Sequence, residues 1–163
     1  MTRGPVRLDV AVGYATPRVG VPAATSFRRW VAAALEGRIR EADLAIRVVG
    51  EDEGRALNRH YRGKDYATNV LSFPADMAEG VKLPKGVILP LMGDIVLCAP
   101  VVAREAAEQA KPTPHHYAHL TVHGVLHLLG MDHQDEREAE CMEQLEREIL
   151  AELGIEDPYR IQD

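Results

Sequence analysis

The stretch His119-Leu-Thr-Val-His123-Gly-Val-Leu-His127-Leu-Leu-Gly130-Met-Asp-His133 contains the densest chemical pattern in the chain, and six of the seven histidines lie between positions 115 and 133. His123 and His127 are four positions apart, so on a helix their side chains lie on one face, about 6 Å apart. Gly130 can adopt the left-handed conformation that ends a helix and turns the chain back. His133 would then reach the same helix end from the other side.

Three converging imidazoles predict a zinc site. Histidine nitrogens bind zinc at ~2.0–2.1 Å, and three of them leave the fourth tetrahedral position open to water, as in catalytic sites. Histidines recur every four residues from position 115, so spacing alone does not select the ligands. The return of the chain past Gly130 selects them, because it would bring His133 only to the helix end that carries His123 and His127. We expect one zinc ion at His123, His127 and His133. His119, one turn away, either supports these ligands from behind or is a surface residue.

The same spacing occurs in the zinc peptidase pattern H-E-x-x-H-x-x-G-x-x-H, whose glutamate is the general base. The corresponding residue here is Gly124, which cannot take a proton from water. A zincin-like metal site is therefore expected without the peptidase base. A zinc-dependent peptidase-like hydrolase remains an alternative that this glycine disfavours.

Length and composition predict a single domain over residues 1–163, because 46% of the residues are hydrophobic and 27% are charged. A net charge of −6 argues against general nucleic-acid binding but does not exclude RNA, since many acidic residues lie in the last thirty positions.

The chain contains no apolar run of ~20 residues and begins without a signal-peptide pattern, so we expect no membrane span and a cytoplasmic location. Cys98 and Cys141 are expected to be isolated, at least half-buried thiols.

Hydrophobic periodicity predicts alternating strands and helices. Strands are expected at 6–12, 44–49, 70–73 and 95–98, and helices at 22–37, 51–61, 101–110, 113–130 and from 135 onward. A loop is expected at 75–90, which is interrupted by glycine and proline. The first helix should bury an apolar stripe, made of Phe27, Trp30, Val31, Ala34 and Leu35.

Two helix starts are predicted from capping residues. Thr113 should cap the histidine helix, with Pro114 at its first position, and Asp135 with Glu138 should form a capping box for the last helix. The last helix should bury one apolar stripe, formed by Met142, Leu145, Ile149 and Leu153. Its glutamates are expected to face solvent, namely Glu140, Glu143, Glu146 and Glu148.

Arg55, Arg59 and Arg62 fall at i, i+4 and i+7 of the second helix and form a basic stripe. Such a stripe is usually a solvated helix face. Here the polar segment 61–68 follows at once, and it is unlike a simple connector.

The histidine segment and this second segment resemble the bacterial YbeY family of rRNA maturation endoribonucleases. The family pattern H-G-x-L-H-L-x-G-x-D-H stands here as His123-Gly-Val-Leu-His-Leu-Leu-Gly-Met-Asp-His133. The pattern N-x-x-Y-R-x-x-D-x-x-T-x-V-L-S-F stands as Asn58-Arg-His-Tyr-Arg-Gly-Lys-Asp-Tyr-Ala-Thr-Asn-Val-Leu-Ser-Phe73, and Gly93-Asp-Ile95 matches a third, shorter element. The resemblance implies a small α/β domain with a mixed, roughly four-stranded sheet.

The resemblance also implies a metal-dependent endoribonuclease that acts on single-stranded RNA, in rRNA processing at the 3′ end of 16S rRNA and in ribosome quality control. It implies zinc at the three histidines and an important role for Arg62. Because the acidic charge disfavours tight unaided RNA binding, we also expect a protein or ribosomal partner. Our hypothesis is that zinc activates water while Arg62 holds the phosphate. Arg59 and Lys64 could extend this contact, and Asp132 either orients a histidine or forms the turn. No general base is evident. A second alternative is a ribosome-binding assembly factor without catalysis.

Overall fold

The computed structural model describes residues 6–75, 90–131 and 135–159. The elements in chain order are β1 (Arg7–Tyr14), α1 (Ala24–Leu35), β2 (Glu41–Val49), α2 (Glu51–Arg62), β3 (Val70–Pro74), β4 (Leu91–Cys98), α3 (Ala99–Glu108), α4 (Thr113–Leu128) and α5 (Glu136–Glu152). Each predicted strand and helix is present, with its ends shifted by a few residues. The predicted loop at 75–90 lies almost wholly outside the described residues.

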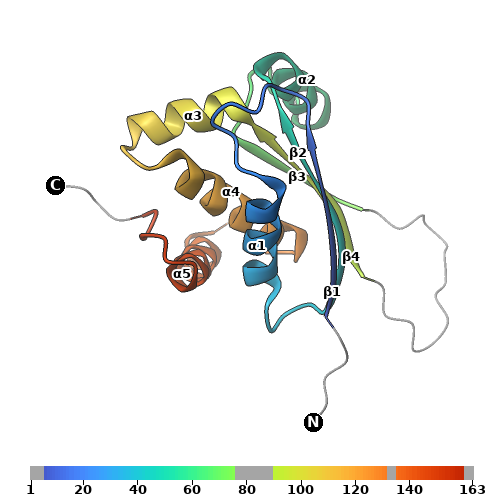
Figure 1. The fold of residues 1–163 in the computed structure, drawn as a ribbon, viewed down its shortest axis with the longest axis vertical. Coiled ribbons are helices and arrows are strands. Elements are labelled where there is room, and N and C mark those ends of the chain that lie inside the picture. Colours follow the sequence, from blue (N-terminus) through green and yellow to red (C-terminus); the bar gives the residue numbers. More distant parts are fainter. Residues whose placement is uncertain (1–5, 76–89, 132–134, 160–163) are drawn as a thin grey trace, which may run out of the picture.

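The sheet has the strand order β1-β2-β4-β3. The strands β1, β2 and β4 are parallel, and β3 pairs antiparallel with β4 at the edge. The mixed four-stranded sheet is therefore confirmed. Helices α1, α4 and α5 lie together on one side of this sheet, and α2 lies at one end of the strands (Figure 1).

Helix α4 is the centre of the packing, with neighbours in β3, β4, α1, α3 and α5. A helix surrounded in this way is apolar on most of its sides. Its buried residues are His116, Tyr117, Ala118, Leu120, Thr121, Val122, Gly124, Val125, Leu126 and Leu128. His123 and His127 are only partly buried, so the histidine face is the part of α4 that reaches the surface.

The predicted core stripe of α1 is confirmed, because all five of its residues are buried. Gly130 has a φ of +94°, which confirms the left-handed turn after α4. The N-cap of α5 is also confirmed, since the Asp135 carboxylate accepts from the Glu138 backbone N–H at 2.8 Å. The predicted role of Thr113 is wrong: it is the first residue of α4, and its side chain forms no cap.

The two cysteines were both expected to be at least half-buried. Cys98 is buried as expected, but Cys141 is exposed. This exposure follows from the register of α5, in which the neighbouring residue, Met142, is the one that faces the core. In the part of the chain that the structure describes, no helix has both the length and the apolar character needed to cross a membrane.

Candidate metal centre

The side chains of His123 and His127 converge. Their Nε2 atoms lie 3.0 Å apart, and the ring centroids are separated by 4.5 Å. Two ligands of a tetrahedral zinc are about 3.3 Å apart, given bonds of ~2.0–2.1 Å. The two nitrogens thus have nearly the separation that a shared zinc ion requires. His133 and Asp132 lie outside the described residues, and within the described residues no group of three or more His, Cys, Asp or Glu side chains could hold a metal.

These two histidines open into a cavity of about 640 Å³ between α4, β3 and the end of α2. We call this cavity the cleft. Its lining residues are Tyr61, Arg62, Thr68, Asn69, Val70, Leu71, Ser72, Phe73, Pro74, His123 and His127. Arg62 is the last residue of α2, its side chain is exposed, and among the described residues it has no hydrogen-bond or ion-pair partner. The structure therefore brings Arg62 and two of the three predicted ligands to one cavity.

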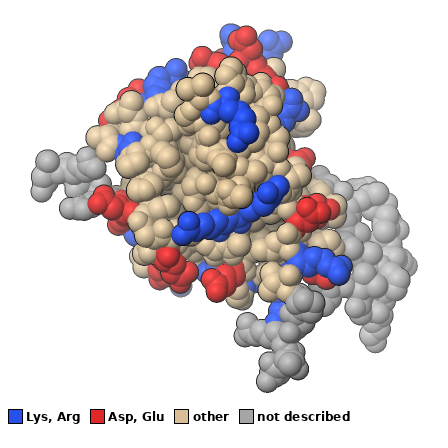
Figure 2. Space-filling model, in the orientation of Figure 1, with Lys and Arg blue, Asp and Glu red and all other residues tan. Residues whose placement is uncertain are grey.

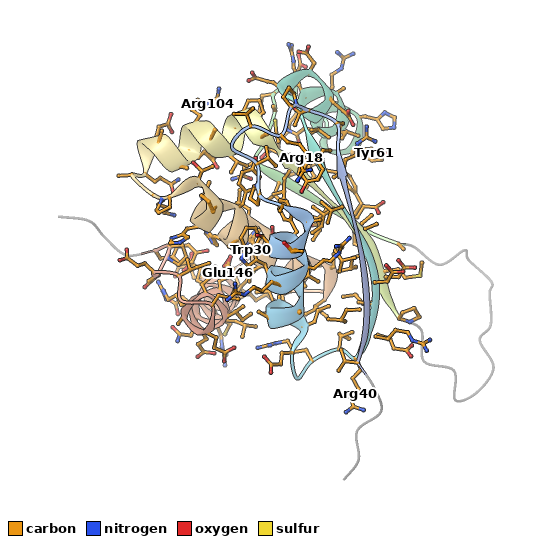
Figure 3. All side chains as sticks on the ribbon, in the orientation of Figure 1. Arg18, Trp30, Arg40, Tyr61, Arg104 and Glu146 are labelled. Carbon is orange, nitrogen blue, oxygen red and sulfur yellow. The ribbon has the colours of Figure 1, made fainter. Side chains whose placement is uncertain are left out.

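Aromatic rings form part of the cleft wall. Tyr61 is 61% exposed, and its ring centroid lies 4.8 Å from that of Phe73, with the two planes inclined at 59°. Figure 3 shows Tyr61 at the end of α2, beside the sheet. Because β3 is an edge strand, its outer backbone edge borders the same cavity. The cleft therefore combines one exposed cation, an aromatic surface and two imidazoles.

The segment after α2 is fixed by two contacts. Arg55 binds Asp65 through two hydrogen bonds of 2.8 Å, from Nε and from Nη2. The buried Asn58 donates from Nδ2 to the Tyr66 carbonyl at 2.7 Å. All three arginines of the predicted basic stripe are exposed, and Arg55, the first of them, is engaged in this local ion pair.

The position of the missing peptidase glutamate is tightly packed. A Cβ atom on Gly124 would lie 3.1 Å from the Ser72 Oγ and 3.2 Å from two carbon atoms of Ile95. The Ser72 hydroxyl also donates to the Gly124 carbonyl at 3.2 Å. Glycine at this position lets α4 lie directly on β3 and β4. A larger side chain would have to displace these neighbours, which further disfavours a peptidase-type base at this position.

Behind the histidines lies a buried carboxylate, and the expectation that it faces solvent is wrong. Glu146 of α5 is 0% exposed, and its Oε1 accepts hydrogen bonds of 3.0 Å from His119 Nε2 and from His123 Nδ1. The Tyr159 hydroxyl donates to Oε2 at 2.8 Å. Burial by itself raises the pKa of this carboxyl, but the hydrogen bonds from the two histidines outweigh it and lower the pKa to about 2.

Comparisons with known proteins agree with this architecture. The family model described as Endoribonuclease YbeY matches residues 20–154. The chain is 79% identical over 159 residues, covering 98% of both chains, to the Endoribonuclease YbeY of Stenotrophomonas maltophilia strain K279a. It is 76% identical over the same length, again covering 98% of both chains, to that of Xanthomonas axonopodis pv. citri strain 306. The chain belongs to the YbeY family.

A solved structure has a similar fold. The solution structure of TM1509 from Thermotoga maritima aligns with 94% of this chain and 99% of its own, with a TM-score of 0.55 and 23% identity. The family model and the two relatives confirm the family resemblance inferred from the two long motifs.

Sequence reasoning missed Glu146, although a signal was present. Position 146 is four residues after Met142 and three before Ile149, so it falls within the predicted apolar stripe of α5. A carboxylate within a core stripe needs partners, because a buried charge is costly unless it is paired. His119, for which two interpretations were open, is one of these partners, and it shares the Glu146 Oε1 atom with His123.

Proposed function

We propose that this YbeY-family chain is a zinc-dependent endoribonuclease that cuts single-stranded RNA, with His123, His127 and His133 as the ligands. The observation that carries the proposal is the convergence of two imidazole Nε2 atoms, 3.0 Å apart, in the cleft that also contains Arg62. Relatives that are 75–79% identical to this chain over nearly their full length are named endoribonuclease.

The donor set fits zinc. Nitrogen ligands suit zinc, whereas magnesium and calcium prefer oxygen. A zinc ion bound by three imidazoles would supply a Lewis acid and lower the pKa of a coordinated water toward ~7. The chain itself would orient the ligands: α4 presents two of them one turn apart, and the left-handed Gly130 stands three positions before the proposed third ligand, His133.

Arg62 would bind the scissile phosphate. A guanidinium is planar, permanently charged and able to form two parallel hydrogen bonds with phosphate oxygens. Its position at the rim of the cleft would let it stabilise the negative charge that grows on those oxygens during attack. Arg59 and Lys64, both exposed nearby, would contact the neighbouring backbone phosphates.

Specificity for single strands would come from the aromatic wall. A flat ring can stack on any unpaired base, whereas a paired base is already stacked within its helix. Tyr61, supported by Phe73, offers such a ring within the cavity that contains the histidines. We therefore propose that the base next to the cleaved bond stacks on Tyr61.

We assign the activity to rRNA processing, notably at the 3′ end of 16S rRNA, and to ribosome quality control, on the strength of the family resemblance. The protein would then act in the cytoplasm. On the face seen in Figure 2, Lys and Arg side chains are interspersed with Asp and Glu, and the net charge is −6. Because RNA affinity depends largely on phosphate neutralisation, a ribosomal partner would help to deliver the substrate.

The test combines metal analysis with cleavage of a labelled single-stranded RNA. The purified wild-type protein should contain one zinc per chain and cut the RNA. Arg62→Ala should keep its zinc and its fold but cut about 10²–10³-fold more slowly, as for loss of one charge-stabilising donor. His127→Ala should lose tight zinc binding. RNA cleavage that is unchanged in both variants would reject the proposal, and turnover of a peptide instead of RNA would favour the peptidase alternative.

A further inference from the structure

We infer that Glu146 is a positioning residue for the metal centre, and that it selects the tautomer and the orientation of His123. This inference rests on the proposed zinc site, but it concerns a residue on a different helix that does not face the cleft. Figure 3 shows Glu146 on α5, where that helix faces α4.

The hydrogen-bond chemistry leads to one tautomer. Both oxygens of Glu146 are approached by donors, His119 and His123 at Oε1 and Tyr159 at Oε2, and a carboxylate surrounded in this way acts only as an acceptor. The His123 Nδ1, 3.0 Å from Oε1, must therefore carry the proton. A neutral imidazole has one proton, so Nε2 keeps its lone pair. That lone pair faces the His127 Nε2, on the side where the metal would bind.

The carboxylate is itself held firmly. His119 Nε2 donates to Oε1 at 3.0 Å, and the Tyr159 hydroxyl donates to Oε2 at 2.8 Å, so both oxygens have partners. With the carboxylate fixed on one side, the His123 ring cannot rotate without breaking its hydrogen bond. Outer carboxylates of this kind orient metal-bound histidines and increase their basicity.

Stability alone does not explain a charge at this position. The α5 residues Met142, Ile149 and Leu150 around it are buried and apolar. Replacing a buried ionic group with an apolar residue of similar size is often neutral or stabilising. A carboxylate in the middle of this stripe is therefore better explained by what it does to His123 than by a contribution to folding.

A second carboxylate–histidine pair, between Glu105 of α3 and His116 of α4, provides an internal control. Glu105 Oε1 accepts from His116 Nε2 at 2.9 Å, and it also accepts from Asn69 Nδ2 at 2.9 Å. The other nitrogen of His116, Nδ1, is buried and has no hydrogen-bond partner in the described part of the chain. His116 also does not line the cleft. The two pairs are alike in chemistry and differ in where the second nitrogen lies.

The experiment compares zinc affinity in full-length variants by competition with a chromophoric chelator. Glu146→Gln keeps the shape but removes the charge, so the hydrogen bond from His123 Nδ1 is no longer charge-assisted. We expect zinc to bind about 10–100-fold more weakly, the usual effect of losing an outer-shell partner. The matched variant, Glu105→Gln, should keep wild-type zinc affinity. Tyr159→Phe, which leaves the His123–Glu146 hydrogen bond intact, should cause a smaller loss than Glu146→Gln.

Cobalt substitution adds a readout that a purely structural role would not change. The Co²⁺ absorption spectrum reports ligand geometry, and we expect it to change in Glu146→Gln but not in Glu105→Gln. A folded Glu146→Gln protein with wild-type zinc affinity and spectrum would overturn the inference.

A measurement on the wild-type protein covers the case in which Glu146→Gln does not fold. Long-range ¹H–¹⁵N NMR of the metal-free protein should show His123 protonated on Nδ1, and protonation on Nε2 would overturn the inference. This measurement also separates the two proposals. If the wild-type protein bound no zinc, the proposed metal site would fail, while the tautomer would still decide the role of Glu146 toward His123.

Discussion

Replacing Gly93 with alanine should destabilise the protein, although the residue lies in a strand, where glycine is normally unfavourable. A Cβ atom on Gly93 would lie 2.7 Å from Cδ2 and 3.2 Å from Cδ1 of Leu128, and 3.0 Å from the Phe73 carbonyl oxygen. The backbone of β3 and a side chain of α4 meet β4 at this point. Glycine is therefore required for close packing of the helix that carries the histidines.

The size of the destabilisation caused by Gly93→Ala follows from two opposing effects. Inserting a methyl group into a well-packed site costs about 1–3 kcal/mol, whereas replacing glycine reduces the entropy of the unfolded chain and gains about 0.4–1 kcal/mol. We expect a net loss of about 1–2 kcal/mol in the free energy of unfolding, since the Leu128 side chain must move and the Phe73 carbonyl, 3.0 Å away, belongs to the backbone and cannot rotate aside. Because Leu128 directly follows His127, the shift should also weaken zinc binding.

Urea unfolding followed by circular dichroism measures the change, with an unaltered slope indicating the same cooperative transition. Gly13→Ala is the matched control: it makes the same substitution in β1, where the added Cβ meets no atom within 4 Å, and stability should not fall. In the Leu128→Ala background, Gly93→Ala should destabilise the protein less than it does in the wild type, because the clashing side chain is gone. The difference, measured in a double-mutant cycle, should be about 0.5–3 kcal/mol. If Gly93→Ala were as stable as Gly13→Ala, the packing argument would be wrong.

Three further outcomes are expected. Tyr61→Ala should raise KM for single-stranded RNA by the equivalent of about 1–3 kcal/mol of stacking while Tyr61→Phe does not, and equal KM values in both variants would contradict base stacking. Burial lowers the pKa of the His116 imidazole below 6.5, more than its hydrogen bond with Glu105 raises it. Protonation therefore favours the unfolded state, so the free energy of unfolding should fall from about pH 7.5 to 5.5, and His116→Gln should flatten this dependence in urea titrations. Asn58→Ala removes the donor to the Tyr66 carbonyl and should cost about 1–3 kcal/mol of stability; an unchanged urea midpoint would refute the importance of that hydrogen bond.

Much of the site could be predicted because its features are local. The separation of His123 and His127 follows from the rise and turn of a single helix, and the left-handed Gly130 follows from the freedom of a residue without a Cβ. The family resemblance implied an important role for Arg62, and the structure places Arg62 in the same cleft as His123 and His127. The role of His133 remains a prediction, since it lies outside the described residues.

Local sequence patterns were enough to predict the helices and strands and the convergence of His123 and His127, because periodicity, caps and turn residues act over a few positions along one segment. Only the tertiary structure decided which glutamate of α5 is buried, because that depends on how α5 rotates and packs against α4. Glu146 is 23 residues from His123, yet their side chains are in contact. Glycine is required at position 93 for a similar reason, because Leu128 and the Phe73 carbonyl leave no room for a Cβ atom there. Contacts between elements distant in sequence depend on the packing of the whole domain, and no local pattern determines them.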